Sequence, residues 1–398
     1  MMTRALLAIG SLVVGCTYEP PTRAAEWYDN AELYPDQSDT HPQRESFRAY
    51  LDGAVRAGLP GAVLLIRTPD GGTWTGAAGF ADIASDVPWQ PSMIGRAGSV
   101  TKTFAAAALL KLLEEHGIPL DAAAKEWLPS KLVSSIHNAG SATLGQLLHQ
   151  TSGIYDYLQA LELYLEGAGS YDYEYQAKEQ LLEYAYGEPA EYPAGGGWNY
   201  SETNFLLLEL IAERLSGMTG PELLDSLVIS ELGLRSTFYA PRQELPKGLV
   251  RGYADLFGDQ RLTDVTDTNL ERFHFDGGVI SNVYDLADFL DAVLGTGFLS
   301  DAARSQLLEI VPTNGNSERG TDYYGCGLIL EQHPVYGAVW GHSGTTFGFT
   351  AHVYHVEQSG ITFAAIVNGS QKALERQSYD WFSPLKSDRI LRLLAGEQ

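Results

Sequence analysis

The stretch "AGSVTKTFAAAALLKLLEEHG", residues 97–117, joins a candidate catalytic pair to a long apolar helix. Ser99 and Lys102 are three positions apart, and residues with this spacing face the same side of a helix, one turn away from each other. The alanine and leucine run predicts a buried helix from Ser99 to His116, closed by Gly117 at a C-cap position. Ser99 therefore has two interpretations: a helix cap, or a nucleophile with Lys102 as its base.

The spacing alone does not decide between them, because "SPLK" at residues 383–386 has it too. There Pro384 follows the serine as it would at the first helical position, so we interpret Ser383 as a cap. A serine hydroxyl is a poor nucleophile unless a positioned base takes its proton, and a desolvated lysine can do so. Exposed N–H groups at a helix N-terminus can also stabilise an oxyanion. The choice for Ser99 thus depends on partners elsewhere in the chain.

Composition describes an ordinary globular protein with 44% hydrophobic and 19% charged residues. A chain of 398 residues exceeds the roughly 250–300 residues at which single cores stop growing, so we expect a large domain with a subdomain, or two domains. The formal net charge of -24, without a cluster of lysine or arginine, argues against nucleic-acid binding.

The N-terminus predicts export. Arg4 precedes an apolar run at residues 5–14 that is shorter than the about 20 residues a bilayer span needs, so residues 1–16 are predicted to be a signal peptide. "VVGC" resembles the bacterial lipobox, which makes Cys16 the expected lipidation site; the alternative is an ordinary secretory signal with an incidental cysteine. Residues 17–45 are polar and contain proline, as a tether would. We therefore expect a lipoprotein of the bacterial cell envelope, without a disulfide because Cys326 is the one other cysteine.

The remaining chain, residues 46–396, predicts an α+β domain. Strands are expected on both sides of a turn at residues 69–72, and again near the C-terminus around a turn at residues 358–360. Expected helices lie at Thr143–Gln150, Tyr175–Tyr184, Thr203–Leu215 (before Gly217), Pro221–Leu232, Asn282–Leu294 (with Ser281 as N-cap) and within residues 384–397. This order suggests an antiparallel sheet built from both chain ends and flanked by helices, with an inserted, mainly helical subdomain at about 118–280.

Five segments in the same order, spanning about residues 48 to 396, resemble the serine beta-lactamase and penicillin-binding-protein superfamily, in its class C and D-alanyl-D-alanine carboxypeptidase branch. They are "GRAGSVTKTF" (95–104), "LGQLLHQTSGIYDY" (144–157), "PAGGGWNYSETNF" (193–205), "DGGVISNVYDLADF" (276–289) and "WGHSGTTFGF" (340–349). The resemblance implies the serine beta-lactamase/transpeptidase-like fold.

The resemblance also assigns catalytic roles. Ser99 corresponds to the acylated nucleophile, Lys102 to its base and Tyr200 to the phenol that relays a proton to the leaving group. His342 begins the third motif, on the strand that borders the site. Each residue alone has a plainer interpretation, such as a half-buried tyrosine or a strand-end histidine; their order along the chain favours catalysis.

The same motifs predict the substrate-binding groups. The backbone N–H groups of Ser99 and Thr345 are the expected oxyanion donors, and Gly344 would let the substrate approach the strand closely. Glu202 departs from the family, which usually has asparagine there. A glutamate that is ionised only accepts hydrogen bonds, and it would favour a charged Lys102. We interpret Glu202 as a change of specificity rather than a loss of activity.

The sequence therefore predicts an exported, lipid-anchored serine hydrolase that needs no cofactor. A D-alanyl-D-alanine carboxypeptidase or related peptidase acting on peptidoglycan stem peptides is favoured, and a carboxylesterase or beta-lactamase of the same fold is the alternative. A non-catalytic cell-wall binding protein is the alternative of another class; the tyrosine-rich residues 155–192 could stack on a glycan, or form a half-buried helical surface. No metal site is expected, because His352 and His355 would face opposite sides of a strand.

Overall fold

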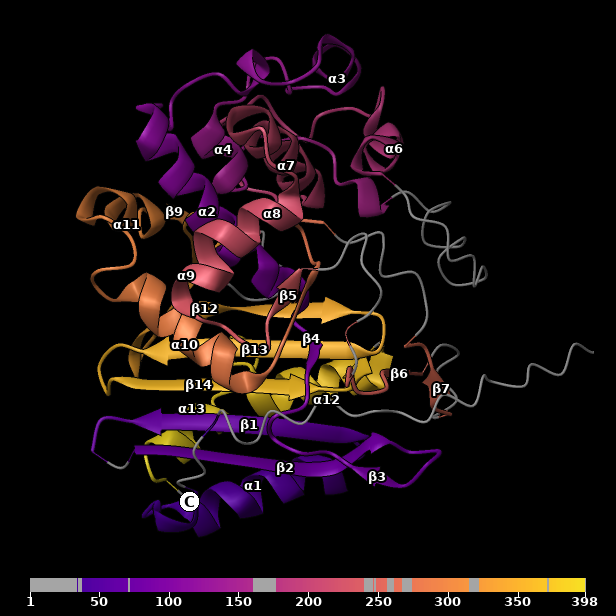
Figure 1. Ribbon diagram of the computed structural model, residues 1–398, viewed down its shortest axis with the longest axis vertical. Coiled ribbons are helices and arrows are strands. Elements are labelled where there is room, and N and C mark those ends of the chain that lie inside the picture. Colours follow the sequence, from indigo (N-terminus) through magenta and orange to yellow (C-terminus); the bar gives the residue numbers. More distant parts are fainter. Residues whose placement is uncertain are drawn as a thin grey trace, which may run out of the picture.

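The computed structural model shows how the two ends of the chain build one sheet (Figure 1). It describes residues 34, 38–70, 72–159, 177–239, 246, 248–255, 261–266, 274–314, 322–370 and 372–397. Cys16, the predicted signal peptide, most of the predicted tether and residues 160–176 of the tyrosine-rich stretch lie outside the described residues. Within the described part of the chain, none of the helices has both the length and the apolar character that a membrane crossing requires.

The strands of the described residues form one large and two small sheets. Their bounds are β1 Gly61–Thr68, β2 Gly72–Asp82, β3 Val87–Pro88, β4 Gly95–Arg96, β5 Phe238–Tyr239, β6 Tyr253–Ala254, β7 Thr263–Asp264, β8 Val279–Ser281, β9 Val311–Pro312, β10 Tyr323–Tyr324, β11 Ile329–His333, β12 Gly337–Thr346, β13 Phe349–Val356, β14 Ile361–Val367 and β15 Gly369–Ser370. The large sheet has the order β3-β2-β1-β14-β13-β12-β11-β10-β9, and the small sheets are β15-β6-β7 and β4-β8-β5.

The large sheet is antiparallel and joins strands from the two ends of the domain. Strand β1, from the start of the domain, pairs with β14, from its end, with Ala62 opposite Val367. The turns after Thr68 and Val356 connect β1 to β2 and β13 to β14, which confirms both predicted hairpins. The predicted α+β class, with an antiparallel sheet assembled from both chain ends, is confirmed.

Helices cover both faces of this sheet and extend beyond one edge. The α-helices are α1 Arg44–Arg56, α2 Thr101–His116, α3 Ser130–Ser135, α4 Leu144–Leu148, α6 Lys178–Leu182, α7 Glu202–Ser216, α8 Gly220–Leu224, α9 Ser230–Leu232, α10 Val283–Leu294, α11 Asp301–Leu307, α12 Lys372–Phe382 and α13 Arg389–Leu394. Shorter turns are the 3-10 segments η2 Ser38–Thr40, η3 Gly98–Val100, η4 Ala124–Glu126, η5 Tyr157–Gln159 and η6 Glu183–Ala185, and the π-helical η7 Asp225–Ile229. Figure 1 shows α3, α4, α6 and α7 gathered at the end of the molecule away from β1 and β2.

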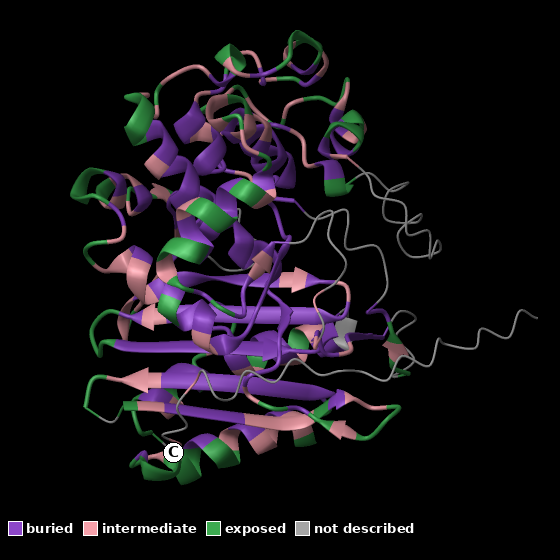
Figure 2. Ribbon diagram, viewed as in Figure 1, coloured by how far each residue is buried: buried purple, intermediate pink, exposed green. Residues whose placement is uncertain are grey.

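The alternating side chains of the strands divide the core in two. Val63 and Leu65 of β1 point to the core that contains α2, α7 and α10, whereas Leu64 and Ile66 point to the core with α1, α12 and α13. Helix α2 is buried along most of its length, as its apolar sequence predicts, and it ends at Gly117 in the left-handed conformation. Figure 2 shows this buried character in the strands and in α2, with exposed residues on the outer surfaces of helices such as α1.

Some local predictions were wrong. The N-cap of α10 is Asn282, whose side chain accepts the Asp285 N–H at 2.9 Å, rather than Ser281. Helix α12 was not predicted, and Ser383 begins no helix: it follows α12, and its Oγ accepts the Leu385 N–H at 3.3 Å in a turn. The predicted helix at Pro221–Leu232, in contrast, is confirmed: α8, η7 and α9 follow one another without a break, and η7 is a π-helical turn.

Candidate active site

Ser99 lies in the 3-10 turn η3, which leads directly into α2. The N-cap position of α2 is Val100, and no side chain caps the helix. The Ser99 side chain instead faces Lys102, with Oγ 3.1 Å from the lysine Nζ. Ser99 is 4% exposed and Lys102 is 0% exposed. The structure therefore excludes the cap interpretation of Ser99 and joins the two residues as a pair.

The Lys102 ammonium group is surrounded by three oxygen-bearing groups. Besides Ser99 Oγ, Nζ contacts the Asp276 backbone carbonyl at 2.5 Å and forms an ion pair with the Glu202 carboxylate. The carbonyl and the carboxylate can only accept hydrogen bonds. A neutral amine could donate one N–H to each of them and keep its lone pair for the Ser99 hydroxyl proton. This coordination is suited to proton transfer between Ser99 and Lys102.

The Asp276 loop holds this carbonyl in place and was missed by the sequence analysis. The Asp276 carboxylate accepts a hydrogen bond from the Tyr157 hydroxyl at 2.6 Å and from the His274 backbone N–H at 2.7 Å. The N–H groups of Gly277 and Gly278 both bond to the His274 carbonyl, which closes the turn. The sequence shows an aspartate followed by two glycines. It does not reveal the acceptor, because every residue has a backbone carbonyl.

A buried charge cluster supports that loop from behind. Glu209 of α7 accepts hydrogen bonds from the Phe275 N–H and the Tyr239 hydroxyl, both at 3.0 Å, and it is paired with His274 and Lys178. Burial alone would raise the pKa of Glu209, but His274 and Lys178 bring it down to about 2. The pKa of His274 is raised, because the attraction of Glu209 outweighs the effect of burial. Glu209 thus anchors residues next to the carbonyl that holds Lys102.

Tyr200 stands immediately before α7 and faces the lysine. The centroid of its ring lies 5.0 Å from Lys102 Nζ, and the ring of Phe205 lies 5.5 Å from the same atom. The start of α7 therefore brings two predicted residues, Tyr200 and Glu202, to Lys102 together. This places a phenol beside the pair that Ser99 and Lys102 form.

His342 lies one layer further from Ser99. It is fully buried, its Nδ1 is 2.5 Å from the Ser343 carbonyl oxygen, and its Nε2 is 3.2 Å from the Tyr324 hydroxyl. A carbonyl cannot donate, so Nδ1 carries the proton. The imidazole packs against Tyr200, with ring centroids 6.4 Å apart. His342 thus lies beside Tyr200 and Tyr324, and its catalytic role stays a prediction. The sequence analysis missed Tyr324.

Strand β12 is packed tightly against the Ser99 turn. A Cβ atom added to Gly344 would lie 2.0 Å from the Ala97 carbonyl oxygen and 2.7 Å from the Ser99 nitrogen. In turn, a Cβ on Gly98, which has a φ of +53°, would lie 2.9 Å from the Thr345 nitrogen. The backbone nitrogens of Ser99 and Thr345 are thus neighbours across this contact. Two N–H donors in this arrangement form the kind of site that stabilises an oxyanion.

A second carboxyl group lies beside Glu202. The Asp156 carboxylate accepts a hydrogen bond from the Glu202 backbone N–H at 3.2 Å and another from Leu158 N–H at the same distance. Burial, and then the negative charge of Glu202, raises the pKa of Asp156 to about 7. Asp156 therefore holds its proton more tightly than an exposed aspartate does.

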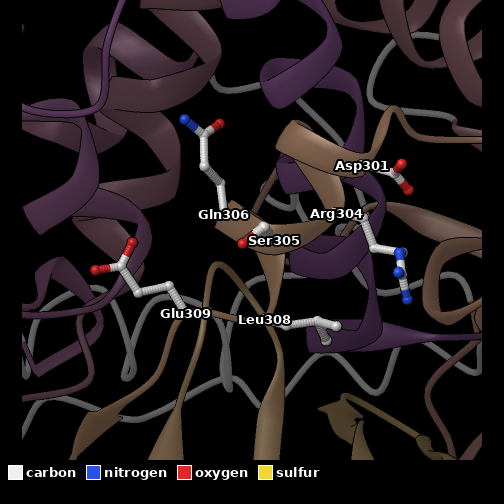
Figure 3. Close-up of a pocket in the computed structure, with 6 residues that line it drawn as sticks. All are labelled: Asp301, Arg304, Ser305, Gln306, Leu308 and Glu309. Carbon is white, nitrogen blue, oxygen red and sulfur yellow. The ribbon is translucent and has the colours of Figure 1, made fainter.

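Other candidate sites do not match this arrangement. A cavity of about 500 Å³ lies at α11. Its side chains do not converge: in Figure 3, Asp301 and Arg304 point away from Gln306 and Glu309. His352 bonds to Ser378 and His355 to Thr362, on opposite faces of β13. Among the residues that the structure describes, no group of three or more potential ligands is placed to hold a metal ion.

Comparison with known proteins agrees with this geometry. The Beta-lactamase family model matches residues 45–382, and the chain belongs to this family. A solved structure of a D-stereospecific amidohydrolase from a Streptomyces species is 28% identical, with a TM-score of 0.75 over 84% of this chain and 97% of that one. The predicted superfamily and its fold are thereby confirmed.

Curated relatives differ in their activities. Penicillin-binding protein 4* of Bacillus subtilis (strain 168) is 27% identical over 286 residues, which are 68% of this chain and 60% of the relative. Esterase EstB of Burkholderia gladioli is 31% identical over 202 residues, 47% of this chain and 49% of the relative. The chain therefore spans between about half and three fifths of the length of these two relatives. The names of these two relatives give one as a penicillin-binding protein and the other as an esterase.

Proposed function

We propose that this protein is a serine hydrolase that cleaves ester or amide bonds through an acyl-enzyme on Ser99. The observation that carries the proposal is the contact of 3.1 Å between Ser99 Oγ and the fully buried Lys102 Nζ, beside two neighbouring backbone N–H groups. A buried lysine on the same helix turn can act as the base that a serine nucleophile requires.

The reaction follows from the positions of these groups. Ser99 Oγ attacks the substrate carbonyl carbon while Lys102 takes the hydroxyl proton, and the carbonyl oxygen gains negative charge against the N–H groups of Ser99 and Thr345. The bond to the leaving group then breaks, Tyr200 delivers its phenol proton to the leaving atom, and the proton held by Lys102 passes to Tyr200, so that both groups return to their starting states. Water attacks the acyl-enzyme by the same route, which releases the acid and restores the Ser99 hydroxyl.

Within this class we propose a peptidase-like activity on amide bonds, of which D-alanyl-D-alanine carboxypeptidase is one form. The similarity to an amidohydrolase over most of both chains supports an amide substrate. A carboxylesterase is the second candidate, favoured by Glu202 and by the esterase among the relatives. Turnover of a short acyl ester should be compared with release of D-alanine from a stem peptide; ester cleavage without D-alanine would exclude the carboxypeptidase form.

We also propose that the chain is exported and anchored by lipid on Cys16. The supporting feature is the short apolar run that ends in "VVGC". Expression in a bacterial host with radiolabelled palmitate should label the full chain but not Cys16→Ser. Equal labelling of both would overturn this proposal without affecting the catalytic one.

The catalytic proposal has a matched control within the chain. A fluorophosphonate probe should label the wild type and the Ser383→Ala variant equally, and should leave Ser99→Ala unlabelled. Ser383 has the same spacing to a lysine, but its Oγ accepts a backbone N–H in a turn. Labelling that survives Ser99→Ala would overturn Ser99 as nucleophile, and a probe-silent wild type that is retained by peptidoglycan would favour a binding protein.

A further inference from the structure

The Lys102 ammonium group directs all three of its N–H bonds to oxygen atoms. Nζ donates to Ser99 Oγ at 3.1 Å and to the Asp276 backbone carbonyl at 2.5 Å, and it forms an ion pair with a Glu202 carboxylate oxygen. An ammonium group has three donors and no lone pair. In this state Lys102 donates to Ser99 and cannot take the Ser99 proton, so it must first lose a proton of its own.

Only one of these three contacts can receive that proton. The Ser99 hydroxyl is the group to be deprotonated, and the oxygen of a backbone amide is too weakly basic to hold a proton. The Glu202 carboxylate is a base, and it contacts Nζ directly. A proton that moves along this contact leaves a neutral amine, whose free lone pair then faces the Ser99 hydroxyl.

Burial reduces the cost of this transfer. The side chain of Lys102 is 0% exposed and that of Glu202 is 9% exposed. Two buried ions lose far more hydration than an amine and a carboxylic acid do, so the interior brings the neutral pair closer in free energy to the ion pair. An asparagine, which the family motif usually has at this position, carries an amide that cannot hold the proton. The glutamate therefore supplies a proton site that the usual asparagine lacks.

The other titratable groups near the pair are acids. They are Asp156 and Tyr157 at the start of η5, Tyr200 before α7 and Asp276 before β8. Burial, and then the charge of Glu202, raises the pKa of Asp156 to about 7. Burial also raises the pKa of Tyr157 well above its ordinary value, so this phenol stays protonated. Above about pH 7 the ionised Asp156 favours a proton on Glu202, because a nearby like charge disfavours the ionised form.

We propose that Glu202 takes a proton from Lys102 and thereby prepares the lysine as the base for Ser99. The proton leaves Nζ for the carboxylate, Nζ then accepts the Ser99 hydroxyl proton as Oγ attacks, and this second proton replaces the one that Tyr200 gives to the leaving atom. Glu202 keeps the first proton through acylation and hydrolysis, and it returns the proton to Nζ when Ser99 is a hydroxyl again. This inference rests on the proposed acyl-enzyme function and adds Glu202 to it.

The direction of a pH shift tests the proposal. The measurement is kcat/KM for a short acyl ester against pH, and in particular its fall at low pH, the acid limb. If Glu202 accepts the proton, the acid limb of the wild type reports protonation of this carboxylate, because a carboxylic acid cannot take a second proton. Glu202→Gln lacks the acceptor, so Lys102 must lose its proton to water. Its acid limb should move to higher pH by about one unit or more, since a lysine holds its proton more tightly than a carboxyl group does.

A glutamate that served only as a counter-ion would give the opposite result. Its removal would make the buried ammonium group easier to deprotonate, and the acid limb of Glu202→Gln would move to lower pH by about 1–3 units. A downward shift, or no shift, would therefore overturn the proposal. Glu202→Asn should move the acid limb in the same direction as Glu202→Gln, and it provides a second variant if the first does not fold.

Two further comparisons assign the shift to Glu202. Glu213→Gln is the matched control, because Glu213 lies on the same helix and pairs with Lys178 at 3.0 Å; it should leave the acid limb in place. In an Asp156→Asn background, where the amide oxygen can still accept the Glu202 N–H, the upward shift should persist. Loss of the shift there would assign the acid limb to Asp156 and overturn the proposal. Ester turnover that persists in Ser99→Ala would instead overturn the proposed function, so the two failures are distinguishable.

Discussion

A serine followed three positions later by a lysine occurs twice in this chain, at Ser99 and at Ser383. The two copies have different surroundings. At Ser99 the lysine is fully buried and its Nζ lies 3.1 Å from the serine Oγ. At Ser383 the serine Oγ accepts the Leu385 N–H at 3.3 Å, in a turn that follows α12. The first pair lies at the start of a helix that crosses the core, and the second lies where a helix has ended. The spacing allows a contact between the serine and the lysine. Burial of the lysine, together with acceptors for its N–H groups, makes that contact suited to proton transfer.

Removing the lysine from each copy should give the largest difference. Lys102→Ala should lower kcat/KM for an acyl ester by about 10²–10⁴, because the base is lost. It should also destabilise the fold by about 3–5 kcal/mol, since Glu202 is left with an uncompensated charge. Lys386→Ala should change neither quantity appreciably. Steady-state kinetics and urea denaturation of both variants provide the measurements, and comparable losses in the two would show that the surroundings do not matter.

The residues around Ser99 were predictable to different degrees. Ser99, Lys102, Tyr200 and the Gly344 region could be found from motifs, because their chemistry depends on residue type and order along the chain. Asp276 could not, since its backbone carbonyl, rather than its side chain, contacts Lys102. Any residue can supply a backbone acceptor, so the residue type at position 276 does not indicate this contact.

The fold was predictable where the hydrophobic pattern was strong. Both hairpins and the apolar helix α2 followed from alternation and from a continuous apolar run. Helix α12 was missed because only one of its faces is apolar, through residues such as Leu374 and Phe382, among polar neighbours. With α12 missed, the position of Glu375 beside Thr345 could not be anticipated.

A test of the packing around Ser99 should give an intermediate effect. Gly344→Ala would place a Cβ 2.0 Å from the Ala97 carbonyl oxygen, which requires β12 to move away from the Ser99 turn. We expect about 1–3 kcal/mol of destabilisation and a loss of about 10²–10³ in kcat through the displaced oxyanion donors.

Gly140→Ala is the matched control for this change. Its nearest new contact is Val133 Cγ1 at 3.3 Å, so a small shift of a side chain accommodates it. Thermal unfolding and ester kinetics compare the two variants. If Gly344→Ala were as active as Gly140→Ala, the backbone contact between β12 and the Ser99 turn would not be needed for catalysis.

The smallest effect on kcat should come from the charge cluster that supports Lys102 indirectly, and its main effect should be on stability. The pKa of Glu209 is about 2 in the folded protein and 4.5 in its ordinary state, so the unfolded chain binds a proton first as pH falls. The stability that Glu209 contributes is therefore present above about pH 4.5 and is lost between about pH 4.5 and pH 2. Urea denaturation at several pH values should show a shallower loss of stability over this range in Glu209→Gln than in the wild type, while the exposed substitution Glu126→Gln should follow the wild type. An unchanged slope in Glu209→Gln would mean that other carboxylates dominate acid unfolding, and that the ion pairs of Glu209 do not stabilise the loop whose carbonyl holds Lys102.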